Sequence, residues 1–403
     1  MKRAIILAFC TATLGTLLSC GGGGSNTSSS RSTVSGIKKR AFISNNFQSQ
    51  IDIINAANDT VNTTVVSNAN GTTSSTPANV ISAGANPSQM VLTPDKKLTL
   101  VFDQGASTIA VITNATESIT TQIPLPAFTE SFVVAQDSTT VYVAVPNAPM
   151  SGPSGAVEVL NATGGTLTST IAVPAARRVV LSHNGSKLLA FADGTDQMFV
   201  VDTAAKTVTT VSGFDRPVYG VFSSDDSKAY IMNCGPECGG NLAKVTVLDM
   251  TSNAPGATVA VSAARFGMLD SSGNLYVAGT TASGGKLDVV NASSLAVNKS
   301  GVAISDGVHT LMALGANNKL FIASRTCTNT VRGCLSIYDI SAGTAVTSAA
   351  GGGDVTGIEP LSGRNVVYVI EGGELIIYDT TTNMPQSTQI DIVGKAFDVR
   401  VVD

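Results

Sequence analysis

The sequence predicts an all-β protein folded as a β-propeller of eight four-stranded blades. A five-residue phrase recurs eight times, with three apolar positions followed by a turn-forming residue. The copies begin at residues 51, 109, 157, 198, 245, 287, 335 and 375, and intervals of 40 to 58 residues are typical of propeller blades. A second strand-like phrase precedes each copy, as Leu320–Ile322 precedes Leu335–Asp339. Tight-turn residues such as His183–Ser186 introduce many of these second phrases.

One blade can be followed strand by strand between residues 310 and 347. Leu311–Leu314 is short and apolar, which suits an inner strand, called A here, that is buried on both sides. Strand B at Leu320–Ala323 follows a Gly- and Asn-rich turn, and strand C at Leu335–Tyr338 follows a longer loop. A weak outer strand, D, is expected at residues 344–347. Strands joined this closely form an antiparallel meander.

The two ends of the chain predict how the ring closes. The propeller begins with a B strand at Ala41–Ile43 and ends with Ala396–Val402, which has the length and apolar content of an A strand. We expect this last strand to pair inside the first blade, so that the ring is closed. Seven blades remain the alternative if the irregular first unit is not a full blade. That unit also contains an insertion, at about residues 68–87, which we expect to be an exposed loop.

The N-terminus predicts export and a lipid anchor. Lys2 and Arg3 precede a mostly apolar stretch of 15 residues, Ala4–Leu18, which is short for a transmembrane helix and suits a signal peptide. The following Leu17–Cys20 resembles the bacterial lipobox, in which the cysteine is lipidated. An ordinary signal peptide with an incidental cysteine is the alternative. By resemblance to Gram-negative sorting, Gly21 after the cysteine favours the outer membrane.

These features divide the chain into three parts. Residues 1–19 are the predicted lipoprotein signal peptide, and residues 20–36 contain the lipidated Cys20 and a flexible tether rich in Gly and Ser. The propeller domain is expected over residues 37–403. The membrane is therefore a predicted partner, reached through the lipid on Cys20.

The repeat resembles that of the YVTN-type β-propellers. Arg40–Asn46 followed by Gln50–Asn55 resembles the two strand motifs of that family, and Lys228–Asn233 resembles the first of them. The literal YVTN tetrad is absent, and the family's PDG turn is reduced to Pro94–Asp95. Lactonase-like propellers have similar repeats, so the resemblance also implies an enzymatic alternative.

Four cysteines form two close pairs in B–C loops, Cys234 with Cys238 and Cys327 with Cys334. Because an exported protein folds in an oxidising compartment, we expect two local disulfides. A metal site is a weaker alternative because neither loop contains a histidine. Redox activity of the first pair is also open, although its spacing differs from the CxxC motif.

The charge balance argues against nucleic acid as a partner. The formal net charge is −4 for the whole chain and only 13% of residues are charged. Removal of the leader makes the charge more negative, since Lys2 and Arg3 are its charged residues. Nucleic-acid binding needs a basic surface, which this composition does not provide.

The D–A loops carry the candidate ligand-binding residues, because these loops converge at one end of the propeller axis. Arg177, Arg265, Asp306 and His309 are the predicted members of a pocket for a polar or anionic ligand. Ordinary solvated loop charge is the alternative. No catalytic triad, metal cluster or phosphate loop is recognisable, so no catalytic residue, metal or cofactor is assigned.

Three functions remain open from the sequence. The first is a monomeric, lipid-anchored envelope protein that binds a protein or glycan partner without catalysis. The second is a lactonase-like hydrolase or isomerase, for which Asp306 and His309 would be the acid–base pair. The third is a purely structural component of the envelope. The propeller fold alone does not decide among them.

Overall fold

A computed structural model describes residues 34–67, 73–328, 333–347, 352–387 and 390–403. The chain divides into two compact units, Met1–Ser30 and Arg31–Asp403, and all described residues belong to the second. The predicted signal peptide, Cys20 and most of the tether lie outside the described residues. Within the described residues, no helix is long and apolar enough to cross a membrane.

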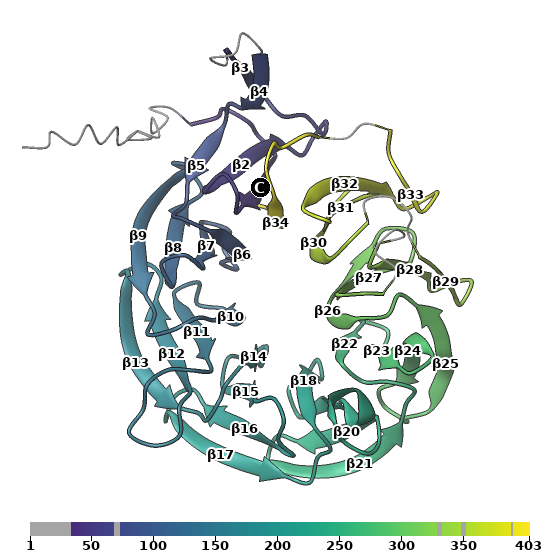
Figure 1. Ribbon diagram of the computed structural model, residues 1–403. Coiled ribbons are helices and arrows are strands. Elements are labelled where there is room, and N and C mark those ends of the chain that lie inside the picture. The colour runs from purple at the N-terminus through teal and green to yellow at the C-terminus, as the bar shows by residue number, and fades with distance from the viewer. Residues whose placement is uncertain (1–33, 68–72, 329–332, 348–351, 388–389) are drawn as a thin grey trace, which may run out of the picture. The chain divides into compact units, whose positions relative to one another are not determined.

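The second unit is an all-β propeller of eight four-stranded antiparallel sheets arranged around an axis (Figure 1). From the innermost strand outward, the first blade is β34 (Ala396–Val401), β1 (Arg40–Asn45), β2 (Gln50–Asn55) and β5 (Val80–Ser82), and the second is β6 (Pro87–Leu92), β7 (Leu98–Asp103), β8 (Thr108–Thr113) and β9 (Ser118–Pro124). The third blade is β10 (Ser131–Val134), β11 (Thr140–Val145), β12 (Ala156–Asn161) and β13 (Thr166–Ala172). The fourth blade is β14 (Arg178–Leu181), β15 (Lys187–Phe191), β16 (Gln197–Asp202) and β17 (Thr207–Ser212).

The remaining four blades follow the same order. The fifth blade is β18 (Pro217–Phe222), β19 (Lys228–Asn233), β20 (Lys244–Asp249) and β21 (Ala254–Ala260), and the sixth is β22 (Phe266–Leu269), β23 (Asn274–Thr281), β24 (Gly284–Asn291) and β25 (Val297–Ile304). The seventh blade is β26 (Val308–Gly315), β27 (Lys319–Arg325), β28 (Leu335–Asp339) and β29 (Thr344–Thr347). The eighth blade is β30 (Val355–Pro360), β31 (Val366–Glu371), β32 (Glu374–Asp379) and β33 (Met384–Pro385). A short 3-10 helix, η1 (Gly235–Cys238), is the single helix of the described residues.

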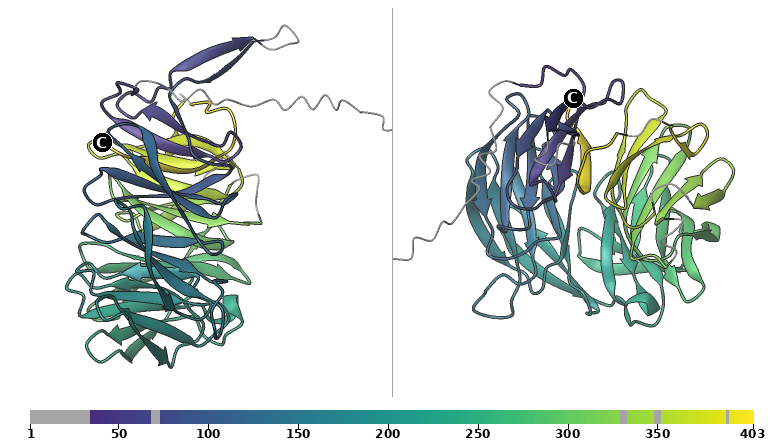
Figure 2. Two further views of the ribbon diagram at one scale, coloured as in Figure 1. Left: turned by 90° about the vertical axis from the view of Figure 1, so that its left-hand side faces the viewer. Right: turned by 45° about the horizontal axis from the view of Figure 1, so that its top comes forward.

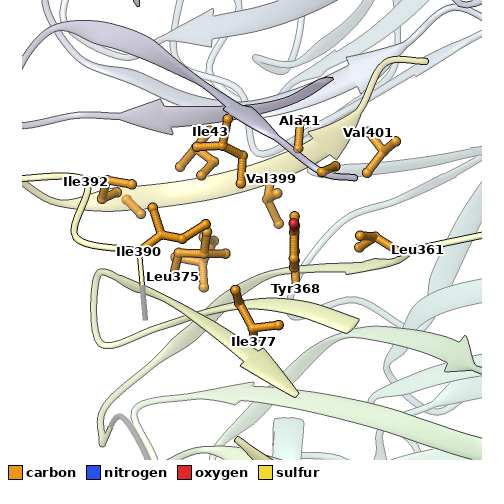
Figure 3. Packing of buried hydrophobic residues seen from close by; sticks show 14 of the residues in the cluster. Ala41, Ile43, Leu361, Tyr368, Leu375, Ile377, Ile390, Ile392, Val399 and Val401 are labelled. Atoms are coloured by element: carbon orange, nitrogen blue, oxygen red, sulfur yellow. The ribbon is translucent and has the colours of Figure 1, made fainter. Parts of the chain in front are cut away.

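The ring closes as predicted, because the C-terminal strand β34 is the inner strand of the first blade. β34 pairs antiparallel with β1, with Val401 opposite Ala41. One hydrophobic cluster spans the first and last blades, and Figure 3 shows Ile43 and Val399 beside Tyr368 within it. The first unit is therefore a full blade, and the seven-blade alternative is wrong.

The predicted exposed loop at about residues 68–87 was wrong in part. Residues 68–72 lie outside the described residues, but β4 (Thr73–Pro77) pairs with β3 (Thr63–Ser67) in a separate hairpin, and β5 is the outer strand of the first blade. The hairpin lies outside the ring of blades (Figures 1 and 2). The prediction failed because low apolar content excludes burial but does not exclude pairing between Thr-rich strands.

The repeated B and C phrases are buried because every blade is packed between two neighbours. In β28 all of Leu335–Tyr338 is buried, whereas the outer strand β13 is mostly exposed. Continuous apolar runs are therefore required in the two middle strands, and alternating or polar sequence is tolerated in the outer ones. This is why the B and C phrases repeat so clearly in the sequence and the D strands do not.

A partly buried ion pair connects the first blade to the last. Arg364, in the turn before β31, donates to both carboxylate oxygens of Asp59, at 2.6 and 2.5 Å. The Tyr368 hydroxyl donates to the same carboxylate. Burial alone would raise the pKa of Asp59, but the hydrogen bonds from Arg364 and Tyr368 lower it below its ordinary value. Asp59 is therefore a charged acceptor that needs both donors.

Replacing Arg364 should weaken the contact between the first and last blades. We expect Arg364→Met to lower the free energy of unfolding by about 3 kcal/mol, because it leaves the Asp59 carboxylate buried without its cation. Urea unfolding of the purified domain measures the change. Lys97→Met is the matched control, because Lys97 pairs with Asp95 on the surface and its loss should change stability far less. Equal losses in the two variants would contradict the role of the partly buried pair.

Candidate functional site

The inner strands of all eight blades line a cavity of about 350 Å³ at one end of the central channel. Figure 1 shows these strands arranged around the axis. The cavity lies where the inner strands begin, so it is bordered by the D–A loops and by the ends of the B strands. The residues that line the cavity include Phe128, Glu130, Arg178, Tyr219, Phe266, Leu311, Arg325, Thr356, Phe397, Asp398 and Arg400.

Irregular pairing at the start of the inner strands brings extra side chains into this cavity. Five of the eight inner strands, β6, β18, β26, β30 and β34, show a register shift near their first residues. Each shift adds one residue that has no partner on the B strand, as a β-bulge does. Thr310, Thr356 and Phe397 are such extra residues, and all three line the cavity.

Aromatic rings form much of the apolar wall. Tyr219 and Phe266, on neighbouring inner strands, stack with ring centroids 4.2 Å apart and planes 24° apart. Phe397 lies beneath the guanidinium of Arg325, whose central carbon is 5.3 Å from the ring centroid. This cation–π contact holds Arg325 in place without neutralising its charge. The cavity therefore combines flat apolar surface with cationic groups.

Two of the three arginines that line the cavity have no acidic partner in the described part of the chain. Arg400 is neutralised, since its guanidinium lies 3.1 Å from Asp398 and 3.7 Å from Glu359. By contrast, no ion pair or side-chain hydrogen bond joins Arg178 or Arg325 to any described residue. An arginine keeps its proton in proteins, so both remain cationic.

The environment of Arg178 disfavours its charge. Burial lowers the pKa of Arg178, and the nearby positive charge of Arg265 lowers it further. Glu130 and Asp193 attract Arg178 at longer range, but both carboxylates are already bonded to Arg177. An anion bound in the cavity would therefore stabilise the positive charge of Arg178, which no described carboxylate bonds directly.

Two buried polar atoms at the cavity also lack a hydrogen-bond partner among the described residues. They are Nε of Arg325 and the hydroxyl oxygen of Thr356. Buried polar groups in folded proteins are nearly always hydrogen-bonded. Both residues line the cavity, so its polar wall is equipped to bond a molecule from outside the chain.

The predicted arginines lie at this end of the propeller but do not line the cavity. Arg177 is on the surface, where it pairs with Glu130 at 3.2 Å and with Asp193 at 2.9 Å. Arg265 lies against the first disulfide, with Nη1 2.7 Å from Sγ of Cys238. Their ligand-binding roles stay predictions, and the structure offers Arg178 and Arg325 in their place.

Asp306 and His309 do not line the cavity and do not hydrogen-bond to each other. Asp306 accepts hydrogen bonds from the backbone and hydroxyl of Thr328, beside a separate hollow of about 250 Å³. His309 is 1% exposed, and its Nε2 donates to the carbonyl of Ser305. Burial lowers the pKa of His309 to about 4, so the ring is neutral at pH 7. The arrangement gives the pair no shared access to a substrate in the channel.

The sequence signal for the residues that were missed was weak. Arg178 directly follows Arg177 and is the first residue of β14, and the sequence alone does not indicate which of the two adjacent arginines faces the cavity. Arg325 is the last residue of β27, at the end of an apolar run that predicts a strand and gives no indication of a site. Phe397 resembles any apolar residue of an inner strand until the register shift in β34 is known.

Both predicted disulfides are confirmed. Cys234 is bonded to Cys238 and Cys327 to Cys334, with Cα atoms 5.6 Å apart in each pair. They fasten two B–C loops at the end of the propeller that contains the cavity. Throughout the described ranges, no group of three or more His, Cys, Asp or Glu residues is placed to hold a metal ion.

Comparisons with known proteins agree on the fold. No protein-family model matches the chain, and no curated protein matches it either. Solved structures do match. Dihydro-heme d1 dehydrogenase NirN in complex with DHE is 13% identical with a TM-score of 0.67, over 90% of this chain and 75% of that chain. These matches establish a propeller.

Two further structures give the same result. A functionally unknown protein from Desulfotomaculum acetoxidans DSM 771 is 17% identical with a TM-score of 0.54, over 78% of this chain and 96% of that chain. The Cps50 (Swd1) β-propeller domain of Myceliophteria thermophila is 10% identical with a TM-score of 0.53, over 72% and 96%. Identities this low carry the fold and no function. The resemblance to YVTN repeats therefore stays a prediction.

Proposed function

We propose that this protein is a non-catalytic binding module of the bacterial cell envelope, and that its central channel binds an organic anion. The observation that supports this most directly is the pair of arginines at one cavity, Arg178 and Arg325, that form no ion pair with a described residue and are attracted by carboxylates only at longer range. Carboxylate and phosphate groups match the planar fork of a guanidinium with two parallel hydrogen bonds. A cavity of about 350 Å³ also falls within the range of small-molecule sites.

Binding is favoured over catalysis by the state of the other titratable groups at the cavity. Asp398 is bonded to Arg400 and Glu130 to Arg177, so both carboxylates are engaged. Burial raises the pKa of Tyr219, so its phenol stays protonated at neutral pH and cannot accept a proton from a substrate. A general acid–base reaction needs a group that is free to exchange a proton with the substrate. Burial raises the pKa of Asp398, but its carboxylate is held by Arg400 and by the backbone N–H groups of Met90 and Val399, so it is not free in this way.

The two neighbouring arginines allow a matched test of anion binding. We expect Arg178→Gln to weaken the binding of citrate and of inorganic phosphate about tenfold, because a charge-assisted hydrogen bond is lost. Arg177→Gln should leave both affinities within about twofold, because its partners are surface carboxylates. Isothermal titration calorimetry on the soluble domain measures each Kd.

The pattern that would contradict this proposal is equally specific. If neither anion binds to wild type, anion binding by this protein is contradicted. If Arg177→Gln weakens binding as much as Arg178→Gln, anion recognition lies outside the cavity. Thermal unfolding of both variants without ligand is the control, since both should melt close to wild type.

The envelope location rests on the two disulfides and on the N-terminal sequence. Disulfides persist in oxidising compartments, which favours a position outside the cytoplasm. We further propose that Cys20 is lipidated and that the protein is anchored to the outer membrane.

Lipidation can be tested in the full-length protein. Cys20→Ser should abolish incorporation of radiolabelled palmitate and should move the protein from the membrane fraction to the soluble fraction. Cys10→Ser, inside the predicted leader, is the control and should change neither result. Retained labelling in Cys20→Ser would contradict the anchor.

A protein or glycan partner is a second candidate, favoured by exposed apolar side chains at the same end of the propeller. Phe47 is 75% exposed and Leu242 is 52% exposed, and both lie in B–C loops. Single exposed apolar side chains are common on protein surfaces, and these two lie in the first and fifth blades, so they offer two separate contact points. We propose that such a partner contacts both loops across the mouth of the channel.

Retention of envelope proteins tests these contact points. A Phe47→Ser, Leu242→Ser double variant, immobilised beside wild type, should retain less of any protein that wild type retains from an envelope extract. Met384→Ser, an equally exposed change on the outer strand β33, is the control. If the double variant retains the same proteins in the same amounts, the two loops have no such role.

A further inference from the structure

Two more hollows continue from the cavity along the inner strands. They measure about 240 and 200 Å³ and lie along β10, β14, β18 and β22. Tyr219 lines both hollows and also the cavity with the arginines, and Val179 lines the cavity and the first hollow. The three spaces are therefore neighbours along one side of the channel.

The walls of these hollows are mainly aliphatic. The apolar side chains that line them are Val133, Val134, Val179, Val180, Leu181, Val221, Phe222, Met268 and Leu269. The polar side chains that join them, Gln136, Ser182 and His183, lie at or just beyond the ends of the strands. None of the lining residues of the two hollows is a Lys, Arg, Asp or Glu.

Polarity changes in one direction along the strands. Arg178 begins β14 and Leu181 ends it, and Phe266 and Leu269 do the same in β22. Three residues span about 10 Å along a strand, so the cationic mouth and the aliphatic region are separated by that distance. On the other side of the channel, β30 and β34 carry Glu359 and Arg400, so the aliphatic wall covers one side only.

We propose that the ligand of the channel is an amphipathic organic anion, whose acid group binds Arg178 and Arg325 and whose apolar chain lies along β14, β18 and β22. This inference rests on the proposed anion-binding function and adds the chemical class of the ligand. The acid group restores a counter-charge to the two arginines, and the chain covers aliphatic side chains that line open hollows. A small hydrophilic anion would use the first part of this site and leave the second part unused.

A series of straight-chain carboxylates tests the proposal on the wild-type domain. Butyrate, hexanoate, octanoate and decanoate are titrated below their micelle concentrations at fixed salt, with calorimetry giving each Kd. We expect the Kd to fall about fourfold for each methylene that is buried, until the hollows are filled. Decanol is the uncharged control and should bind at least tenfold more weakly than decanoate.

Two matched variants locate the chain. Leu181→Thr removes aliphatic surface from both hollows and should flatten the dependence on chain length. Leu314→Thr is the control, because Leu314 is 43% exposed near the end of the inner strand β26 and lines neither hollow. Arg178→Gln should weaken all four carboxylates by a similar factor and leave the dependence on length in place.

The outcomes separate this inference from the function on which it rests. If butyrate and decanoate bind equally well, and Arg178→Gln weakens both, the amphipathic ligand is overturned and anion binding stands. If Arg178→Gln changes none of the affinities, the proposed function fails as well. Equal slopes for Leu181→Thr and wild type would also overturn the inference, since the apolar chain would then lie elsewhere.

Discussion

Closure of the ring is the constraint on which the rest of this structure depends. A propeller blade is a sheet with two apolar faces, and each face needs a neighbour. Pairing of β34 with β1 supplies the last neighbour, and the hydrophobic cluster between the first and last blades forms only when that pairing is made. Arg364 and Asp59 fasten the same junction by an ion pair between residues 305 positions apart in the sequence. β34 also brings Phe397, Asp398 and Arg400 to the cavity, so closure completes the candidate site as well as the fold.

The way in which the inner strands run explains why the channel has two different ends. Seven blades begin with their inner strand, and the first blade takes its inner strand β34 from the C-terminus. Because every inner strand runs antiparallel to the second strand of its blade, all eight inner strands start at the same end of the axis. Residues at the start of these strands therefore meet at one level, and residues at their ends meet at another. Charged and aromatic residues occupy the first level, and aliphatic residues occupy the second along β10, β14, β18 and β22. A repeat that is simple in sequence thus produces a gradient of polarity along the axis.

The architecture could be predicted from the sequence because its causes are local and repeated. Eight buried phrases, the apolar C-terminal strand and two close cysteine pairs each leave a direct pattern. The site could not be predicted as well, because it depends on register between strands, and a shift of one residue moves a side chain to another face. Arg177 and Arg178 differ by one position, as do His309 and Thr310, yet in each pair only the second lines the cavity. The bulge beside His309 and Thr310 arises from strand pairing and has no clear sequence signature.

The distribution of charge at the mouth of the channel explains why two arginines remain for a ligand. Arg177 is bonded to two surface carboxylates, and Arg400 lies between Asp398 and Glu359. Arg265 lies against the disulfide in the loop of η1 and is attracted by Glu237, whose carboxylate is fixed by the backbone of Thr280. The disulfide thus helps to hold Arg265 beside the cavity. Arg265 does not line the cavity wall, but its positive charge acts on Arg178. Since like charges gathered in a partly buried space repel, the remaining cations gain most from an anion that enters the channel.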